Sequence, residues 1–150
     1  MEFREALANY IKVLPGITPG QSMFLLKSIN KVNIPVYCIL VGIHYFQKCL
    51  NNSLDTYQKL AASIYLGYRL NKDRYVSVKN WSGLTFVDQK SIVFYESQIL
   101  RVLKYSVQVN HTTITKTLSH VKKFGQYIAI LPTSPVSPCL TPRASFPFQI

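Results

Sequence analysis

The segment LAASIYLGYRLNKDR, residues 60–74, decides the fold class because nearly every side of it is apolar. Apolar side chains recur at helical spacing from Tyr57 to Tyr68, and small or apolar residues fill the opposite side. A helix without a polar face is surrounded by other helices. We therefore predict an all-α fold with this helix, which begins after Ser53, at its centre. One permanent charge, Arg69, stands near the end of the segment.

Four further segments carry apolar residues at helical spacing and predict helices around the central one. No run of alternating polar and apolar residues indicates a strand. The expected domain is a single five-helix unit whose third helix is central. The four surrounding helices are predicted at about residues 21–31, at 34–50, from 85 to about 103, and after the HTT at 111–113.

Two helix starts are predicted from capping residues. Asn33 is expected to cap the helix at 34–50, and Thr85 with Asp88 is expected to form a capping box. Between the third and fourth helices, RYVSVKNW at 74–81 is interpreted as the start of an ordered loop rather than a strand.

Breaker residues divide the chain into three parts. PGITPG at 15–20 separates an N-terminal arm, residues 1–20, from the helical domain, residues 21–128. Residues 129–150 hold five of the eight prolines, and we expect an extended, mobile tail.

Composition argues against several classes of function. Six carboxylates among 150 residues make a carboxylate-based active site improbable, and the glycines form no phosphate-binding loop. No HExxH motif or CxxC pair indicates a metal site. We predict no enzymatic activity, no catalytic residue, no metal, no cofactor and no small-molecule substrate.

The cysteines and the apolar runs bear on location. Three cysteines without a pairing pattern favour a reducing intracellular compartment, in the nucleus, the cytoplasm or both. The N-terminus lacks the pattern of a signal peptide. IPVYCILVGIHYF at 34–46 is shorter than the roughly 20 residues of a membrane span, so we expect no such span.

A carboxylate complements Arg69. In IVFYESQILRVLKYSV, residues 92–107, Glu96 shares one helix side with Ile99 and other apolar residues. A buried charge without a partner costs several kcal/mol, so both charges need one. Either Arg69 pairs locally with Asp73 and Glu96 with a surface lysine, or Arg69 and Glu96 lie together and jointly bind another protein.

Here the residues resemble a known family, the cyclin box. LVGIHYFQKCL, residues 40–50, is similar to the family's YIDRFL helix, with Tyr45 and Phe46 matching and Lys48 in place of its arginine. The resemblance extends over about residues 21–127. It implies a five-helix domain that binds a protein kinase.

The two charged residues fall at informative positions of the resemblance. Arg69 stands where the family has a kinase-contacting lysine, and Glu96 stands at its kinase-contacting glutamate. Gln47 replaces an aspartate of the family, and the helix at 21–31 lacks the MRAIL pattern of the substrate-docking patch. Arginine is not equivalent to lysine, because a planar fork of donors replaces a point charge.

A narrower resemblance is to the fungal Pcl cyclins, which activate the phosphate-responsive cyclin-dependent kinase. It rests on Asn71, Asp73, Trp81, Gly83 and Leu84. The resemblance implies a regulatory subunit that binds and activates such a kinase and helps direct it to substrates. The expected kinase-binding residues are Arg69, Glu96, Tyr68, Leu70, Asn71, Asp73, Ile99 and Leu100.

The formal charge of +11 keeps a second interpretation open, a nucleic-acid-binding cyclin fold of the transcription factor IIB kind. Those proteins use two tandem repeats, whereas the resemblance implies one in this sequence. In the tail, Ser134, Ser137 and Thr141 each precede a proline, the step that proline-directed kinases choose. They are candidate phosphosites, set against the alternative of a simple linker.

Overall fold

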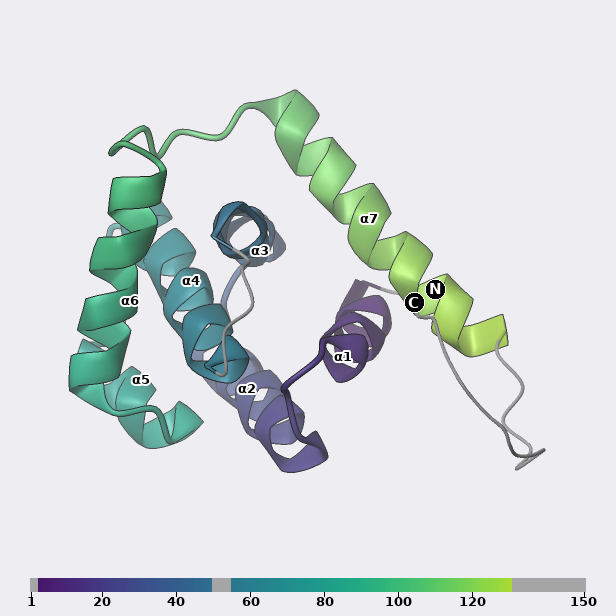
Figure 1. Cartoon of the computed structure of the whole chain (residues 1–150), viewed down its shortest axis with the longest axis horizontal. Coiled ribbons are helices and arrows are strands. Elements are labelled where there is room, and N and C mark those ends of the chain that lie inside the picture. The colour runs from purple at the N-terminus through teal and green to yellow at the C-terminus, as the bar shows by residue number, and fades with distance from the viewer. Residues whose placement is uncertain (1–2, 50–54, 131–150) are drawn as a thin grey trace.

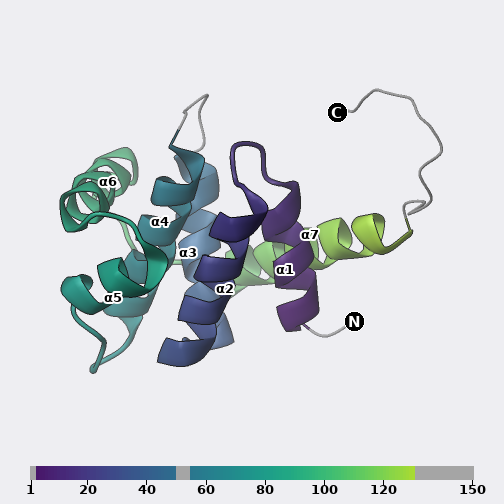
Figure 2. The same ribbon diagram turned by 90° about the horizontal axis from the view of Figure 1, so that it is seen from below.

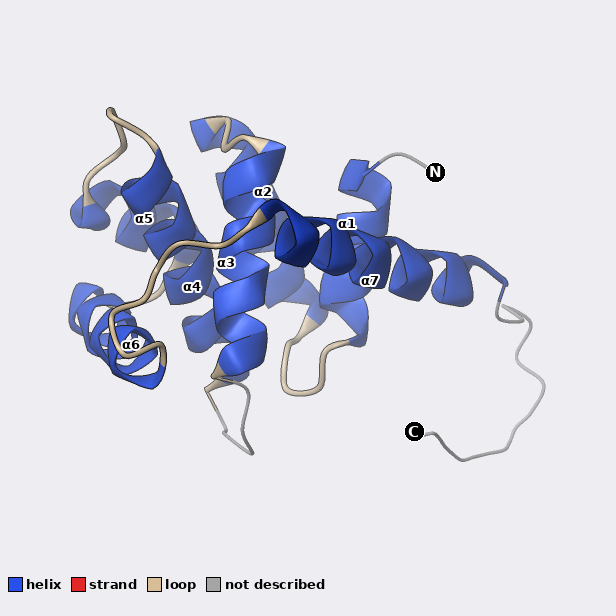
Figure 3. Ribbon diagram, turned by 90° about the horizontal axis from the view of Figure 1, so that it is seen from above, coloured by secondary structure: helices blue, strands red, loops and turns tan. Residues whose placement is uncertain are grey.

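The computed structural model describes residues 3–49 and 55–130. Within these ranges the chain is entirely helical, without a strand, so the prediction of an all-α protein is confirmed (Figure 3). The helices are α1 (Phe3–Val13), α2 (Pro19–Val32), α3 (Val36–Lys48), α4 (Thr56–Asn71), α5 (Val78–Thr85), α6 (Gln89–Val102) and α7 (His111–Ile130).

Helix α4 is the expected third helix, and it lies in the middle of the fold between α3 and α6 (Figures 1 and 2). Every residue from Leu60 to Tyr68 is buried, in agreement with the absence of a polar face in the sequence. Burial on all sides means that α4 holds the surrounding helices together through apolar contacts.

Helices α3 and α4 cross at two glycines. A Cβ atom added to Gly67 would come 2.7 Å from the backbone nitrogen of Gly42, and one added to Gly42 would come 2.6 Å from the Cα of Ile64. Only the missing side chains allow the two backbones to approach this closely.

Helix α5 occupies the segment that was expected to be a loop, and that expectation was wrong. Ser77 caps the helix by accepting a hydrogen bond from the Asn80 backbone N–H (3.2 Å). Trp81 is fully buried, donates from Nε1 to the Ala61 carbonyl (3.1 Å) and stacks on the Tyr65 ring. These contacts with α4 stabilise a short helix that is marginal in isolation.

Helix α1 lies within the segment that was expected to be an arm. Its residues Ala6, Leu7, Tyr10 and Ile11 are buried, and the helix packs against α7 and α2 (Figure 2). The breaker segment that follows is a connection between helices, because Thr18 forms a capping box with Gln21 at the start of α2.

Both predicted caps differ from the structure. Asn33 ends α2 in a left-handed conformation (φ 63°), which asparagine tolerates well, and Pro35 precedes α3. The side chain of Asp88 alone caps α6, accepting from the Lys90 N–H (3.1 Å). Thr85 belongs to α5, where its hydroxyl donates to the Trp81 carbonyl (2.8 Å).

None of the described helices has both the length and the apolar character needed to cross a membrane. Residues 3–49 and 55–130 also contain no group of three or more His, Cys, Asp or Glu side chains that could hold a metal ion.

Candidate functional site

The two charges singled out in the sequence meet between α4 and α6. Arg69 Nε lies 3.5 Å from Glu96 Oε2, and the side chains are 31% and 11% exposed. The prediction that these residues lie together is confirmed. Among the described residues, Arg69 forms its ion pair with Glu96 and not with Asp73.

Apolar packing brings the pair together. Leu66 is one turn before Arg69 and Ile99 is one turn after Glu96. Both belong to a second hydrophobic cluster formed by α3, α4, α6 and α7. Tyr65 on α4 is also close, since burial first and then the Glu96 charge raise the pKa of this phenol to about 12. Its hydroxyl donates to the Val76 carbonyl (2.7 Å).

The carboxylate of Glu96 is incompletely compensated. Burial raises the pKa of Glu96 above its ordinary value, and the positive charge of Arg69 offsets this only in part. Oε2 is buried and accepts no hydrogen bond from the described residues, because the contact with Arg69 has the length of an ion pair only. A second molecule can therefore reach this carboxylate only through the small part of the Glu96 side chain that remains exposed, which is 11%.

The other predicted contact residues divide by exposure. Leu70, Asn71 and Asp73 are exposed, and Leu100 is half-buried. Tyr68 and Ile99 are buried, so they support the helices from inside. The amide of Asn71 donates to the Gly67 carbonyl (2.7 Å) and closes the last turn of α4.

Tyr105 was missed at the level of sequence. The residue is 69% exposed, and its backbone N–H donates to the Leu100 carbonyl (2.8 Å). Lys104 and Tyr105 both have left-handed backbone conformations, with φ of 53° and 61°, so helix α6 cannot continue past Val102 into them. The apolar pattern continues past this point, so no local signal marked the tyrosine as exposed. We refer to Arg69, Leu70, Glu96 and Leu100 as the α4–α6 surface.

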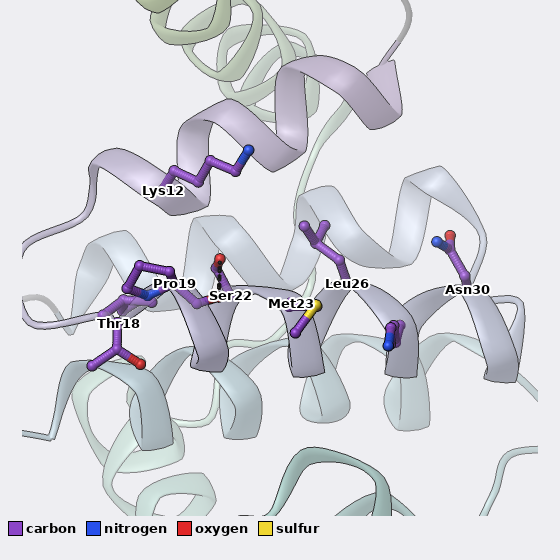
Figure 4. Close-up of a pocket in the computed structure, with 9 residues that line it drawn as sticks. Lys12, Thr18, Pro19, Ser22, Met23, Leu26 and Asn30 are labelled. Carbon is purple, nitrogen blue, oxygen red and sulfur yellow. Dashed lines mark hydrogen bonds between the residues drawn. The ribbon is translucent and has the colours of Figure 1, made fainter.

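A groove of about 580 Å³ lies elsewhere, between α1 and α2. Figure 4 shows Lys12 on α1 facing side chains of α2 that include Leu26 and Asn30. The groove is mostly apolar and has Lys12 and Lys27 among its lining residues. It involves none of the residues of the α4–α6 surface.

The predicted phosphosites Ser134, Ser137 and Thr141 lie outside the described residues. The surface between α4 and α6 presents the partly exposed guanidinium of Arg69, a fork of donors, beside the exposed side chain of Leu70. No protein-family model, curated protein or solved structure matches this chain.

Proposed function

We propose that this protein is a regulatory subunit that binds and activates a cyclin-dependent protein kinase of the phosphate-responsive type and helps direct it to substrates. The observation that carries the proposal is the Arg69–Glu96 ion pair, which stands at the two positions where the cyclin resemblance implies kinase contacts. Leu70, which follows Arg69 in the chain, supplies exposed apolar area next to the pair.

The proposed contacts use both members of the pair. Arg69 donates to backbone carbonyls of the kinase, and the part of the Glu96 side chain that remains exposed accepts from a backbone N–H. These contacts hold the kinase C-helix in the position where its glutamate pairs with the catalytic lysine. Phosphoryl transfer is carried out by the kinase. A shift from about 1% to about 99% active kinase requires roughly 5.5 kcal/mol of preference for the active state.

Capture of the full chain from its native cells, followed by mass spectrometry, tests the proposal. We expect a cyclin-dependent kinase to co-purify with the wild type and to be depleted with Arg69→Ala and with Glu96→Gln. Lys27→Ala, an exposed substitution on α2, serves as the control and leaves recovery unchanged. Recovery of no such kinase, or equal recovery with all variants, would contradict the proposal.

The C-terminal tail provides a further observable for the same proposal. The captured kinase is expected to phosphorylate Ser134, Ser137 or Thr141, because binding of this protein would tether the tail near the kinase active site.

The second candidate function, nucleic-acid binding, is favoured by the formal charge of +11. It predicts tight binding of duplex DNA with a steep dependence on salt, whereas the kinase proposal predicts weak binding.

A further inference from the structure

A polar hollow of about 670 Å³ lies between α3 and α7, on a part of the molecule that the α4–α6 surface does not use. Helix α3 contributes three residues spaced by three and four positions, and α7 contributes four with the same spacing. The seven lining residues are His44, Gln47, Lys48, Thr113, Lys116, Thr117 and His120.

The lining carries only positive or neutral groups. Lys48 and Lys116 are exposed and face the hollow from opposite helices. Gln47 stands where the cyclin resemblance has an aspartate, so this chain lacks the carboxylate that would neutralise a lysine there. The seven lining residues include no Asp or Glu. An anion entering the hollow would therefore meet no repulsion from its walls.

Neighbouring residues hold the walls in place. The Gln47 amide donates to the Tyr10 hydroxyl of α1 (3.5 Å), and the Tyr10 ring packs edge-on against His120 (5.8 Å). The Phe124 ring packs edge-on against both, with centroid distances of 4.6 Å to His120 and 5.8 Å to Tyr10. Thr113 lies in the first turn of α7, where the helix dipole adds positive potential. Asn110 caps that turn by accepting from the Thr113 N–H (2.8 Å).

Both histidines favour the neutral form when no anion is bound, because their pKa values are lowered. Burial first and then Lys48 lower the pKa of His44, while burial first and then Lys123 lower the pKa of His120. Lys116 lines the same hollow as both histidines, and Tyr10 faces His120 as a neutral phenol, because burial raises the pKa of Tyr10. A bound dianion would favour the protonated imidazoles, so the hollow would gain positive charge as the pH falls.

We propose that the hollow between α3 and α7 binds the phosphate group of a small anionic ligand. Lys48 and Lys116 supply charge-assisted hydrogen bonds from two sides, and the histidines add donors as they protonate. The site is independent of kinase binding, since it shares no residue with the α4–α6 surface.

Histidine NMR signals of the full chain provide the test, because the protein has three histidines and His111 does not line the hollow. Titration with sulfate, whose charge is constant in this pH range, should shift His44 and His120 and leave His111 unchanged. Sulfate affinity should rise as the pH falls from about 8 to about 5.5. Orthophosphate and pyrophosphate then distinguish a ligand with one phosphate group from a ligand with two.

Three variants make the test specific. Lys116→Gln should weaken pyrophosphate binding about tenfold. Gln47→Glu, nearly equal in size, should abolish binding and raise the pKa of His44. Lys27→Gln removes the same charge outside the hollow and should leave binding unchanged. Circular dichroism confirms that each variant is folded.

Equal shifts of all three histidines, or equal losses in Lys116→Gln and Lys27→Gln, would overturn the proposal, because binding would then be non-specific. The proposal would also be overturned if duplex DNA bound more tightly than pyrophosphate and this binding were lost on Lys116→Gln. The hollow between α3 and α7 would then be assigned to nucleic-acid binding.

Discussion

Glu96 is more deeply buried than Arg69, although the two side chains form one ion pair. The carboxylate side chain is 11% exposed, whereas the guanidinium side chain is 31% exposed and keeps contact with water. The cost of desolvation therefore falls mainly on the glutamate, which agrees with its raised pKa.

Replacement of Glu96 by glutamine is expected to stabilise the isolated chain at neutral pH. Burial raises the pKa of Glu96, so the folded state binds this proton more tightly than the unfolded state does. Glu96 therefore adds stability as the pH falls through its raised pKa and costs stability when ionised. Chemical denaturation should show Glu96→Gln more stable than wild type at pH about 7 and equal to it below pH about 4.

Glu5→Gln removes the same charge from an exposed position of α1 and is the control for this experiment. It should not increase stability at neutral pH. A Glu96→Gln variant that is less stable than wild type at pH about 7 would show that Arg69 fully compensates the carboxylate.

The same pair should behave as a coupled unit in kinase binding. Arg69→Ala is expected to weaken binding by about 2–5 kcal/mol, since it leaves a buried charge unpaired at the interface. Glu96→Ala should cost a similar amount, and the double variant should cost less than the sum of the two. Calorimetric titration of the kinase measures all three, with helical circular dichroism as the check on folding. Loss of helical signal in the single variants would assign the pair to internal stability.

Gly67→Ala is expected to destabilise the chain by about 2 kcal/mol or more. Alanine favours the helix by about 1 kcal/mol, but its Cβ would lie 2.7 Å from backbone nitrogen of Gly42, which cannot rotate away. Gly83→Ala is a matched control within α5, where an added Cβ meets no atom within 4 Å. This substitution should stabilise the chain by up to about 1 kcal/mol, so thermal unfolding should move the two variants in opposite directions.

Trp81→Phe is expected to lower the free energy of unfolding by about 2 kcal/mol. The change removes the hydrogen bond to the Ala61 carbonyl and part of the stacking on Tyr65. Circular dichroism must follow the unfolding, because Trp81 is the single tryptophan. An unchanged midpoint of denaturation would show that α5 forms without this anchor.

Several features required the tertiary structure. The β-branched residues of YVSVKNW argue against a helix, but the burial of Trp81 against α4 outweighs that weak local preference. The predicted capping box of Thr85 and Asp88 does not form, because α5 extends to Thr85 and Asp88 alone is left to cap α6. Exposure next to Arg69 could not be read from the apolar pattern either, since Tyr68 is buried and Leu70 is exposed.

The sequence by itself predicted an all-α fold with a central helix that begins after Ser53, because a segment that is apolar on every side can be satisfied only inside a bundle; among the described residues this helix spans 56–71. It also indicated that Arg69 and Glu96 needed partners, because ionised groups on apolar faces are costly. Only the tertiary structure decided that they pair with each other across 3.5 Å. That distance depends on how closely α4 and α6 pack, and packing is a property of the assembled core rather than of either segment.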